Sequence, residues 1–325
     1  MENLKPSYVD KKVVDKMIKW MKGLYGQDMR VSRGKNHYYL RMILESSLRE
    51  QVAVTMVDYL EGVISNFEEV EMLTGTAASP DAEHLCAIRE ESNQKKIDEK
   101  RATAFHHAVA QLIFACPRAR KDIQTTVYFL TKIVHRPNED DWGGLKHVLR
   151  YVRRTINLPL ILRAYSLTVI KWWVDASYLA HPDMRGQAGT TMSLRRGSVI
   201  GITKKHRINA KSSTEAELIG ADDTIPQMLW TRCFIKAQGF TINKSVLLED
   251  NISAMLLEWN GMVSKSNPKK HIRVRYYFIK DRISTGGIVV KHFPIREMLA
   301  YHFTKPLQGA LFKNSGRKYK ESPPP

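Results

Sequence analysis

Four carboxylates lie within the twelve residues SSTEAELIGADD (212–223), a segment whose pattern predicts the start of a helix. Ser212 and Glu215 have the spacing of a capping box, with serine at the N-cap and glutamate as the third helical residue. Asp222 and Asp223 lie toward the C-terminal end, where the helix dipole disfavours negative charge. We therefore assign Glu215 to the cap and expect Asp222 and Asp223 to face solvent.

Glu217 differs from its acidic neighbours. It lies about 200° around the helix from Glu215. Its own stripe holds Ala221, Thr224 and Met228, an almost apolar row. A carboxylate on such a face is partly buried, and burial is costly unless a cation meets the charge. Glu217 is therefore the acid of this segment that we expect to do chemistry.

Two more carboxylates stand at the ends of predicted strands. Asp175 ends VIKWWV (169–174), and Asp250 ends VLLE (246–249) just before a predicted helix. Alone, a strand-ending turn explains Asp175 and a helix cap explains Asp250. Together with Glu217, the two aspartates could converge on hard divalent cations such as Mg²⁺. Two-metal sites of this kind support in-line cleavage of phosphodiesters.

The composition favours a polyanionic partner. The 325 residues carry 51 Lys and Arg against 33 Asp and Glu, a net charge of +18. A chain this basic is typical of nucleic-acid binding, and a basic but inert surface is the alternative. The three cysteines are far apart and predict neither a disulfide framework nor a zinc site. No signal peptide or membrane span is evident, so we expect a soluble intracellular protein, cytoplasmic or nuclear, without a membrane partner.

Hydrophobic periodicity predicts a helix-rich first half and a mixed α/β second half. In the first half we expect helices at 9–24, 59–67, 104–116, 122–134 and 142–154, with Asp122 and Asp140 or Asp141 as caps, and strands at 37–45 and 51–56. In the second half we expect strands at 169–177, 190–197, 198–205, 246–250 and 287–293, a helix from 212 that is interrupted at Pro226, and helices at 251–259, 271–283 and from 296.

Several of these runs together resemble one family. The runs are RPNEDDWGGLKHVLRYVRRTINLPL (136–160), VDASYLAHPDMRGQAG (174–189), AKSSTEAELIGADD (210–223), EDNISAMLLEWNG (249–261), HIRVRYYFIKDRI (271–283) and MLAYHFTKPLQG (298–309). In this order and spacing they resemble the C-terminal part of the polyprotein of copia-type LTR retrotransposons. That part comprises the end of the reverse transcriptase, a helical connection and the ribonuclease H domain.

The resemblance implies an α/β fold with a ribonuclease H-like mixed sheet flanked by helices. The implied divisions are a reverse-transcriptase palm/thumb remnant (1–72), a linker (73–98), a helical connection (99–165), a ribonuclease H-like domain (166–312) and a disordered tail (313–325). It implies that Asp175, Glu217 and Asp250 are catalytic metal ligands. The family's mechanism uses two Mg²⁺ to cleave RNA in an RNA–DNA hybrid, and contacts to 2′-hydroxyls distinguish RNA from DNA.

The sequence departs from the family at the fourth metal ligand. Family members have aspartate in A-D-x-x-T-K-P-L, and here Tyr301 stands in its place. A phenol is neutral at pH 7, is a poor Mg²⁺ ligand and is bulkier than aspartate. His302, next to it, prefers softer metals. We therefore expect a weak or one-metal site.

The N-terminus departs further. Glu2 and Asn3 occupy the positions of the polymerase's two catalytic aspartates, and the earlier palm segment of the family is missing, so we expect no polymerase activity. Residues 37–42 resemble the primer-grip region, with Arg41 where the family has glycine. The missing reverse-transcriptase segment is an expected partner in the intact element.

A basic aromatic segment follows Asp250. Arg273 stands where the family usually has an acidic residue, in a run that also carries aromatic side chains. Such a mixture suits phosphate contact with aromatic support. The alternative is a solvated basic helix whose aromatic residues face the core. The residues we expect to bind nucleic acid are Lys269, Lys270, Arg273, Arg275 and Lys305.

Three interpretations follow from the sequence. In the first, the chain is a catalytically impaired ribonuclease H that still binds nucleic acid, since charge is spread over many residues whereas the metal site needs four. In the second, the ribonuclease H is active and tolerates Tyr301. In the third, the chain is a non-enzymatic interaction module or a pseudogene-like product.

Overall fold

The structure is a computed structural model that describes residues 5–6, 8, 10–26, 29–46, 51–81, 95–164, 167–260, 270–307, 309 and 312. Glu2, Asn3, Lys269 and the tail 313–325 lie outside these residues, as do the side chains of Lys270 and Arg273. The expectations for these positions therefore stay predictions.

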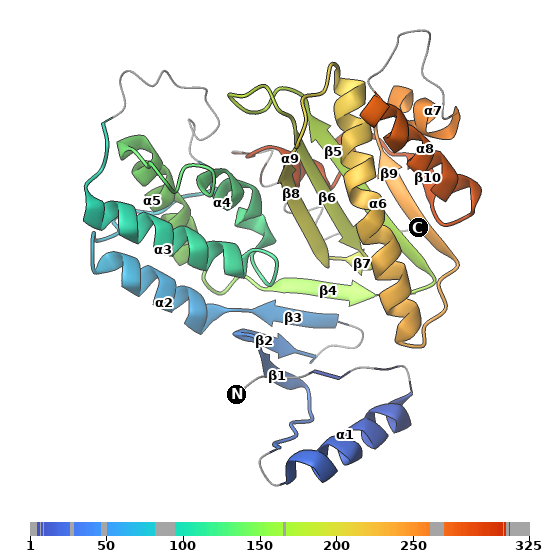
Figure 1. Cartoon of the computed structure of the whole chain (residues 1–325). Helices are drawn as coiled ribbons and strands as arrows, with labels where there is room; N and C mark the ends of the chain where they lie inside the picture. The colour runs from blue at the N-terminus through green and yellow to red at the C-terminus, as the bar shows by residue number, and fades with distance from the viewer. Residues whose placement is uncertain are drawn as a thin grey trace.

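Two β-sheets and their helices make up the described chain (Figure 1). The elements in order are α1 (Lys11–Tyr25), β1 (Asn36–Tyr39), β2 (Met42–Glu45), β3 (Gln51–Thr55), α2 (Val57–Glu68), α3 (Glu99–Ala115), the 3-10 helix η3 (Lys121–Ile123), α4 (Gln124–Leu130), α5 (Glu139–Arg154), β4 (Leu160–Ala164), β5 (Val169–Ser177), β6 (Gln187–Ser193), β7 (Arg195–Arg196), β8 (Ile200–Lys205), α6 (Ser213–Ala237), β9 (Lys244–Glu249), α7 (Ile252–Asn260), α8 (Lys270–Ser284), β10 (Val289–His292), the 3-10 helix η4 (Ile295–Glu297) and α9 (Tyr301–Thr304).

The second sheet has the strand order β10-β9-β5-β6-β8. Strands β5, β9 and β10 run parallel to one another, and β6 and β8 are antiparallel to their neighbours. Helices α6, α7 and α8 cover one face, and α9 packs on the other. This order and direction define a ribonuclease H-like mixed sheet flanked by helices, as predicted.

The first sheet has the order β1-β2-β3-β4-β7 and is antiparallel throughout. The sequence did not indicate β4, because its five residues are all only partly buried and its partner β3 is about a hundred residues away. The predicted strand 190–197 splits into β6, in the second sheet, and β7, which pairs with β4. The two sheets are therefore joined through β4 and β7, across the predicted limit at 165.

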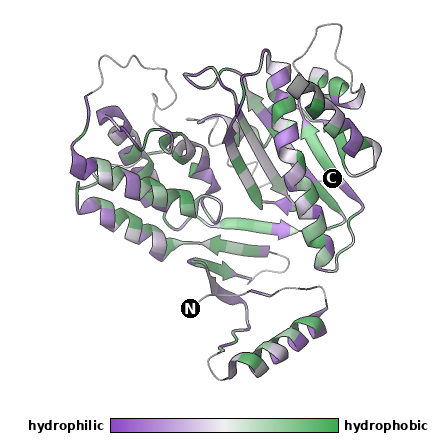
Figure 2. Ribbon diagram, in the orientation of Figure 1, coloured by the Kyte–Doolittle hydropathy of each residue, from purple (hydrophilic) through white to green (hydrophobic). Residues whose placement is uncertain are grey.

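The hydrophobic interior follows this division. One core lies among α2, α3, α4 and α5 and reaches the first sheet, and a second lies between the ribonuclease H-like sheet and α6, α7 and α8. A smaller third core holds Trp173, Leu248 and Ala300 on the opposite face of that sheet. Figure 2 shows apolar residues running along β4 and β9, while polar residues alternate around the helices.

Ser212 caps helix α6 as predicted, but Glu215 does not complete the capping box with it, and the helix is not interrupted. The Glu215 backbone N–H donates to Ser212 Oγ at 3.2 Å, and the Glu215 carboxylate accepts from the Lys211 backbone N–H at 2.7 Å. The predicted interruption at Pro226 is wrong, because α6 continues through it to Ala237. Pro226 removes one helical hydrogen bond on the exposed side, while Ile225 and the next turn stay packed in the core.

The predicted caps of two other helices are wrong. Asn138, not Asp140 or Asp141, is the N-cap of α5, and Asp141 is the third residue of a complete capping box with it. Asp122 lies in η3, where it accepts from the buried Arg120 guanidinium at 2.9 Å and from the Tyr151 hydroxyl at 2.9 Å. An aspartate near the start of a helix can either cap the helix or pair with a cation. Here the buried Arg120 guanidinium takes the carboxylate of Asp122.

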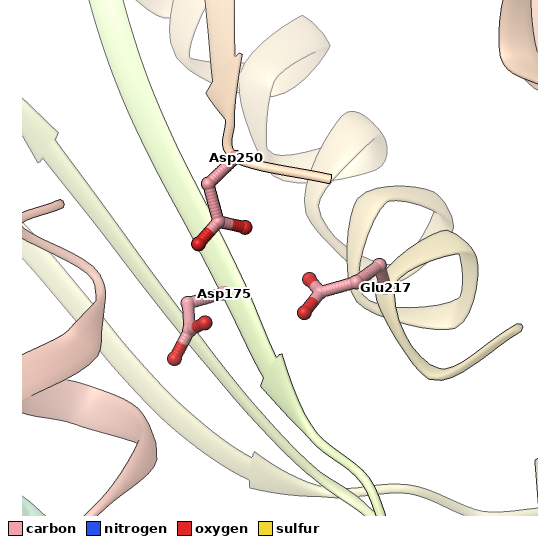
Figure 3. Close-up of side chains that lie close together, drawn as sticks. All are labelled: Asp175, Glu217 and Asp250. Carbon is pink, nitrogen blue, oxygen red and sulfur yellow. The ribbon is translucent and has the colours of Figure 1, made fainter. Parts of the chain in front are cut away.

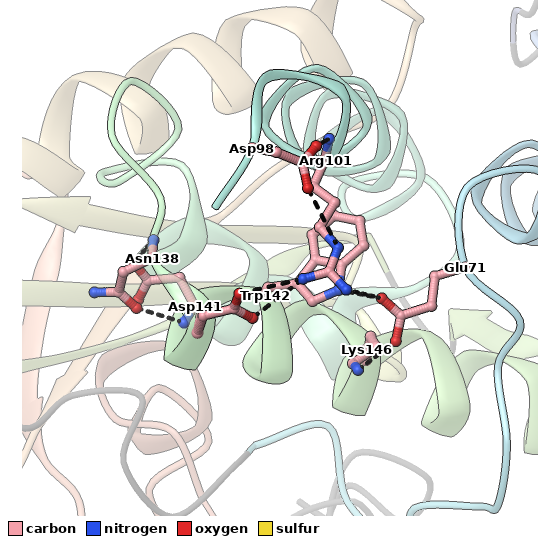
Figure 4. Close-up of polar contacts among 8 residues, drawn as sticks. Glu71, Asp98, Arg101, Asn138, Asp141, Trp142 and Lys146 are labelled. Carbon is pink, nitrogen blue, oxygen red and sulfur yellow. Dashed lines mark hydrogen bonds and ion pairs between the residues drawn. The ribbon is translucent and has the colours of Figure 1, made fainter. Parts of the chain in front are cut away.

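A polar network joins the start of α3 and α5 to the turn after α2 (Figure 4). The Glu71 carboxylate accepts from Trp142 Nε1 and from Lys146 Nζ, each at 2.7 Å, and pairs with Arg101 at 3.2 Å. Arg101 also pairs with Glu139 at 3.2 Å. The hydrogen bond from Lys146 is the largest effect that lowers the pKa of Glu71. The network thus ties three segments together around one carboxylate.

Helix α1 carries the predicted apolar stripe but buries none of its residues. Trp20 is 64% exposed and Leu24 is 59% exposed. Its N-cap is Asp10, whose side chain accepts from the Lys12 backbone N–H. Periodicity alone therefore predicted the helix, although the described residues leave its apolar face uncovered.

Among the described residues, no helix combines the length and apolar character needed to cross a membrane.

The turn between β1 and β2 suggests why the family has glycine at the position that Arg41 occupies here. Leu40 has φ 50° and Arg41 has φ 66°, so both central residues of this two-residue hairpin are left-handed. Hairpin turns of this kind favour glycine, because a Cβ is strained at positive φ. Arg41 therefore holds the hairpin in a conformation that costs stability.

We expect Arg41→Gly to stabilise the protein by about 1 kcal/mol, since it removes the strained Cβ. Thermal denaturation at one pH and salt concentration measures the effect. Arg41→Ala is the matched control, because it removes the same charge and length but keeps the Cβ. Equal stabilities of the glycine and alanine variants would contradict the strain at this turn.

Candidate metal centre

The three carboxylates singled out in the sequence lie together at one end of the ribonuclease H-like sheet. Each of Asp175, Glu217 and Asp250 offers an oxygen, and the three oxygens lie within 4.8 Å of one another (Figure 3). We call these residues the carboxylate triad. Asp175 and Glu217 are each 6% exposed, and Asp250 is half-buried.

Parallel pairing of β5 and β9 brings the two aspartates together. Trp173 is paired with Leu248, so Asp175 and Asp250, each two residues further on, occupy equivalent positions at the same sheet edge. Asp175 lies within β5, as in the predicted strand 169–177, and the alternative of a strand-ending turn at Asp175 is wrong. The backbone of Asp175 is paired with Gly189 of β6, which fixes the position from which its side chain extends.

Asp250 is not the cap of the following helix. Asn251 Oδ1 accepts from the Ala254 backbone N–H at 3.0 Å, which is the N-cap hydrogen bond of α7. This corrects the cap explanation for Asp250 and leaves its carboxylate available to the triad.

Helix α6 supplies Glu217 from above the sheet. The stripe of Glu217, Ala221, Thr224 and Met228 is buried along its whole length. Gly220 lets the helix approach β5 closely, since a Cβ there would lie 3.2 Å from Val174. The Ser212 cap sets where the helix begins. The apolar stripe that singled out Glu217 in the sequence is thus the face that packs on the sheet.

The electrostatics of the triad call for a cation. Burial raises the pKa of Glu217 well above its ordinary value, and Asp175 and Asp250 raise it further. Burial also raises the pKa of Asp175, against a hydrogen bond from Thr304 that lowers it. Asp175 Oδ2 and Glu217 Oε2 are buried without a hydrogen-bond partner among the described residues. Hard carboxylate oxygens with unused lone pairs fit a divalent cation.

The fourth ligand position is filled differently. Tyr301 begins α9, is half-buried and packs against both the helical core and the small third core. His302 points away from the triad, into the helical part of the protein. Its carbonyl accepts from the Thr125 hydroxyl at 2.6 Å, and its ring lies 5.7 Å from that of Phe312. Among the described residues, His302 is not part of the cluster of possible metal ligands, and the Tyr301 phenol is a poor ligand for a hard divalent cation.

Sequence reasoning missed a second buried acidic pair beside the triad. Glu249 and Glu258 are both fully buried, and none of their carboxylate oxygens has a hydrogen-bond partner among the described residues. Burial raises the pKa of both, and the nearby Glu258 carboxylate raises that of Glu249 further. The signal was present, because Glu258 follows the buried residues Ala254 and Met255 by four and three positions.

The two aspartates expected to face solvent form ion pairs instead. Asp222 pairs with Arg275 of α8, and Asp223 pairs with Lys204 of β8 at 2.9 Å. That expectation was wrong because the partners come from other elements of the fold. Arg275, predicted to contact nucleic acid, thus already has an anionic partner. Tyr276 beside it faces the core, whereas Tyr277 is 60% exposed.

A hollow in the described chain lies away from the triad. It has a volume of about 800 Å³ and lies between α2 and α3, lined by residues such as Asn66, Glu69, Lys100 and His107. No member of the triad lines it. The candidate metal site therefore lies at one end of the sheet and not in this hollow.

Strand order and carboxylate triad together define a ribonuclease H-like domain. The chain is 28% identical, over 201 residues and 61% of its length, to the retrovirus-related Pol polyprotein from transposon RE2 of Arabidopsis thaliana. It is 27% identical, over 256 residues and 76% of its length, to the corresponding polyprotein from transposon TNT 1-94 of Nicotiana tabacum. These homologues confirm the predicted resemblance to a copia-type retrotransposon polyprotein. The chain spans 14% and 18% of the two relatives.

Two solved structures to which the chain is similar are a viral protease-reverse transcriptase and a ribonuclease H. The foamy viral protease-reverse transcriptase in complex with RNA/DNA hybrid matches 87% of this chain and 34% of its own, at 8% identity and a TM-score of 0.47. LC11-RNase H1 matches 42% of this chain and 92% of its own, at 14% identity and a TM-score of 0.32. No protein-family model matches the chain.

The acidic pair Glu249 and Glu258 predicts a pH dependence of stability. A carboxyl whose pKa is raised on folding keeps its proton where the unfolded chain has released it. The free energy of unfolding therefore falls as pH rises above about 4.5, the ordinary value for glutamate. We expect Glu258→Gln to reduce this fall, because a neutral amide has no proton to lose.

Thermal melts between about pH 5 and pH 8, without divalent metal, measure the change. The variant should be the more stable protein at the higher pH. Glu297→Gln, at an exposed position, is the matched control and should follow the parent protein. Parallel pH profiles for Glu258→Gln and the parent would contradict a raised pKa at Glu258.

Proposed function

We propose that the chain is a fragment of a copia-type polyprotein whose ribonuclease H-like domain binds RNA–DNA hybrids and hydrolyses their RNA strand weakly. The observation that carries the proposal is the carboxylate triad with Tyr301 in the fourth position. In this proposal residues 1–72 are a palm/thumb remnant, 99–165 the connection and 166–312 the catalytic domain. Polymerase activity is absent, because Glu2 and Asn3 replace its aspartates.

In this mechanism Asp175, Glu217 and Asp250 hold divalent metal, with Mg²⁺ the physiological ion. Bound metal would activate a water and stabilise the leaving oxygen of an in-line phosphodiester cleavage. The chain's own part is to hold the three carboxylates in place before metal arrives. Burial of Asp175 and Glu217 and the lack of other partners for their oxygens support this role.

Tyr301 is the reason for weak activity. It offers no carboxylate, and its contacts with two hydrophobic cores hold it in position. A neutral phenol cannot share a second divalent ion with the triad as aspartate would. The domain is therefore impaired at the level of metal binding, while the fold around the triad is intact.

Binding of nucleic acid depends on charge spread over the surface. The net charge of +18 favours a polyanion, and counterion release makes such binding salt-dependent. The proposed phosphate contacts are Lys269, Lys270, Arg273 and Lys305, together with Arg275, which also pairs with Asp222. Contacts to 2′-hydroxyls would select the RNA strand.

Tyr301→Asp tests the impairment. In a hybrid-cleavage assay with Mg²⁺ and then Mn²⁺, we expect this variant to cleave about tenfold to a hundredfold faster than the parent, since it restores a carboxylate ligand. Asp250→Asn should abolish cleavage in both backgrounds. Robust Mg²⁺-dependent cleavage by the parent, with no gain from Tyr301→Asp, would instead establish a ribonuclease H that tolerates tyrosine.

Hybrid binding is tested separately from cleavage with Asp250→Asn. We expect fluorescence anisotropy to show binding whose logarithmic affinity falls linearly with the logarithm of the salt concentration. Double-stranded DNA of the same length is the control for preference. Absence of salt-dependent binding to either duplex would favour a non-enzymatic product without a nucleic-acid partner.

A further inference from the structure

Helix α4 belongs to the helical first half of the chain but packs on the ribonuclease H-like sheet, where it contacts β8 and α9 (Figure 1). Within the described residues, β8 is the last strand of this sheet and has a neighbouring strand on one side only. Gln124 Nε2 donates to the Gly201 carbonyl at 2.8 Å, and the Lys205 backbone N–H donates to the Tyr128 hydroxyl at 2.8 Å. Side chains of α4 therefore bond backbone groups of β8 in place of a further strand.

Thr125, the residue after Gln124, reaches from α4 to α9. It is 4% exposed, and its hydroxyl donates to the His302 carbonyl at 2.6 Å. A carbonyl in an α-helix accepts from the N–H four residues further on, but the residue four positions after His302 is Pro306, which has no N–H. The Thr125 hydroxyl therefore gives the short helix α9 a hydrogen bond that its own backbone cannot supply.

On its other side, α9 lies against the sheet with no space for a side chain between them. Gly189 is the partner of Asp175 in the ladder of β5 and β6, and a Cβ at Gly189 would come within 2.5 Å of Thr304 Oγ1. A Cβ at Gly201 would come within 2.5 Å of the Phe303 ring. The Thr304 hydroxyl also lies 3.5 Å from the Asp175 backbone oxygen. Helix α9 is therefore held between α4 and the pair of strands that carries Asp175.

Two features of the candidate metal site depend on where α9 lies. The helix packs beside the backbone of Asp175, on the face of the sheet opposite α6. It also begins with Tyr301, the residue at the fourth ligand position. Residues behind the ligands of a metal fix the orientation of those ligands, and their loss lowers the affinity for the metal. The buried Thr125 hydroxyl stands behind α9 in this way.

We propose that Thr125 is a positioning residue of the carboxylate triad: through the His302 carbonyl it holds α9 against Asp175, so that the helical half of the chain sets the geometry in which the triad binds metal. This inference rests on the metal site of the proposed function. Thr125 acts through α9 and is not itself a metal ligand. Loss of its hydroxyl therefore weakens metal binding and leaves the affinity for an RNA–DNA hybrid unchanged.

The test is Mn²⁺ binding by isothermal titration calorimetry, without nucleic acid. We expect Thr125→Val to weaken Mn²⁺ binding about threefold to tenfold, since it removes the hydroxyl but keeps the size of the side chain. Thr125→Ala also lacks the hydroxyl and should show a loss of the same order. Thr125→Ser keeps the hydroxyl and should stay within about twofold of the parent.

Thr131→Val is the matched control at the end of the same helix. The Thr131 hydroxyl donates to the Tyr128 carbonyl at 2.6 Å, within its own segment and not to α9. This control also loses one hydroxyl and one hydrogen bond, and its Mn²⁺ affinity should stay within about twofold of the parent. Thermal melts set a temperature at which all variants are folded, so that a lost fold is not read as a lost ligand geometry.

Tyr301→Asp supplies the second arm, because it places a carboxylate on α9 itself. We expect this variant to bind Mn²⁺ more tightly than the parent. Residues that act through one shared element give non-additive effects, whereas independent effects add. The gain from Tyr301→Asp should therefore be smaller in the Thr125→Val background and unchanged in the Thr131→Val background.

Equal Mn²⁺ affinities for Thr125→Val and Thr131→Val, with the same gain from Tyr301→Asp in both, would overturn the inference. If Asp250→Asn removes Mn²⁺ binding in that case, the proposed metal site stands and only the role of Thr125 fails. If Asp250→Asn leaves Mn²⁺ binding unchanged, or if neither the parent nor Tyr301→Asp binds Mn²⁺, the proposed function fails together with the inference.

Discussion

Mutual repulsion among three closely spaced carboxylates, two of them buried, is the constraint on which the rest of this structure depends. Parallel strands β5 and β9 end side by side, and α6 lays a third acid over them. None of the three has an ion pair within the described residues, and burial adds to the repulsion. Only a rigid scaffold keeps such groups together, since each would be better solvated apart. The packed stripe of α6 and the Asn251 cap of α7 provide that rigidity.

Helix α9 links this site to the rest of the chain. Its residues contact β5 and β6 on one side, while Tyr301, Leu307 and Phe312 pack against the helical core on the other. The same short segment therefore positions Thr304 beside Asp175. A bulky aromatic at the fourth ligand position suits a segment held between two cores, although it brings no charge to the metal. The gain in packing and, in the proposed function, the lack of a fourth carboxylate are thus two consequences of one residue.

Much of the fold was predictable, because local patterns and tertiary packing agree. The strands of the ribonuclease H-like sheet and most helices were expected from periodicity. Strand β4 was not, because its stabilising partner is far away in sequence. Pro226 predicted a break in α6, but the helix continues because the residues around the proline pack in the core. The same holds for charge: Asp222 and Asp223 were placed in solvent because the sequence does not show which cations the fold brings near them.

The sequence by itself determined which acids could form a site. A carboxylate on an apolar helical stripe and two at the ends of apolar strands are local properties, and the substitution at Tyr301 is visible without a structure. Only the tertiary structure decided how the charges are balanced. It left the Asp250 carboxylate out of the helix cap, which Asn251 provides, and it buried Glu249 and Glu258 beside the triad. The physical reason is that burial and Coulomb interaction depend on distance in space, which spacing along the chain does not define.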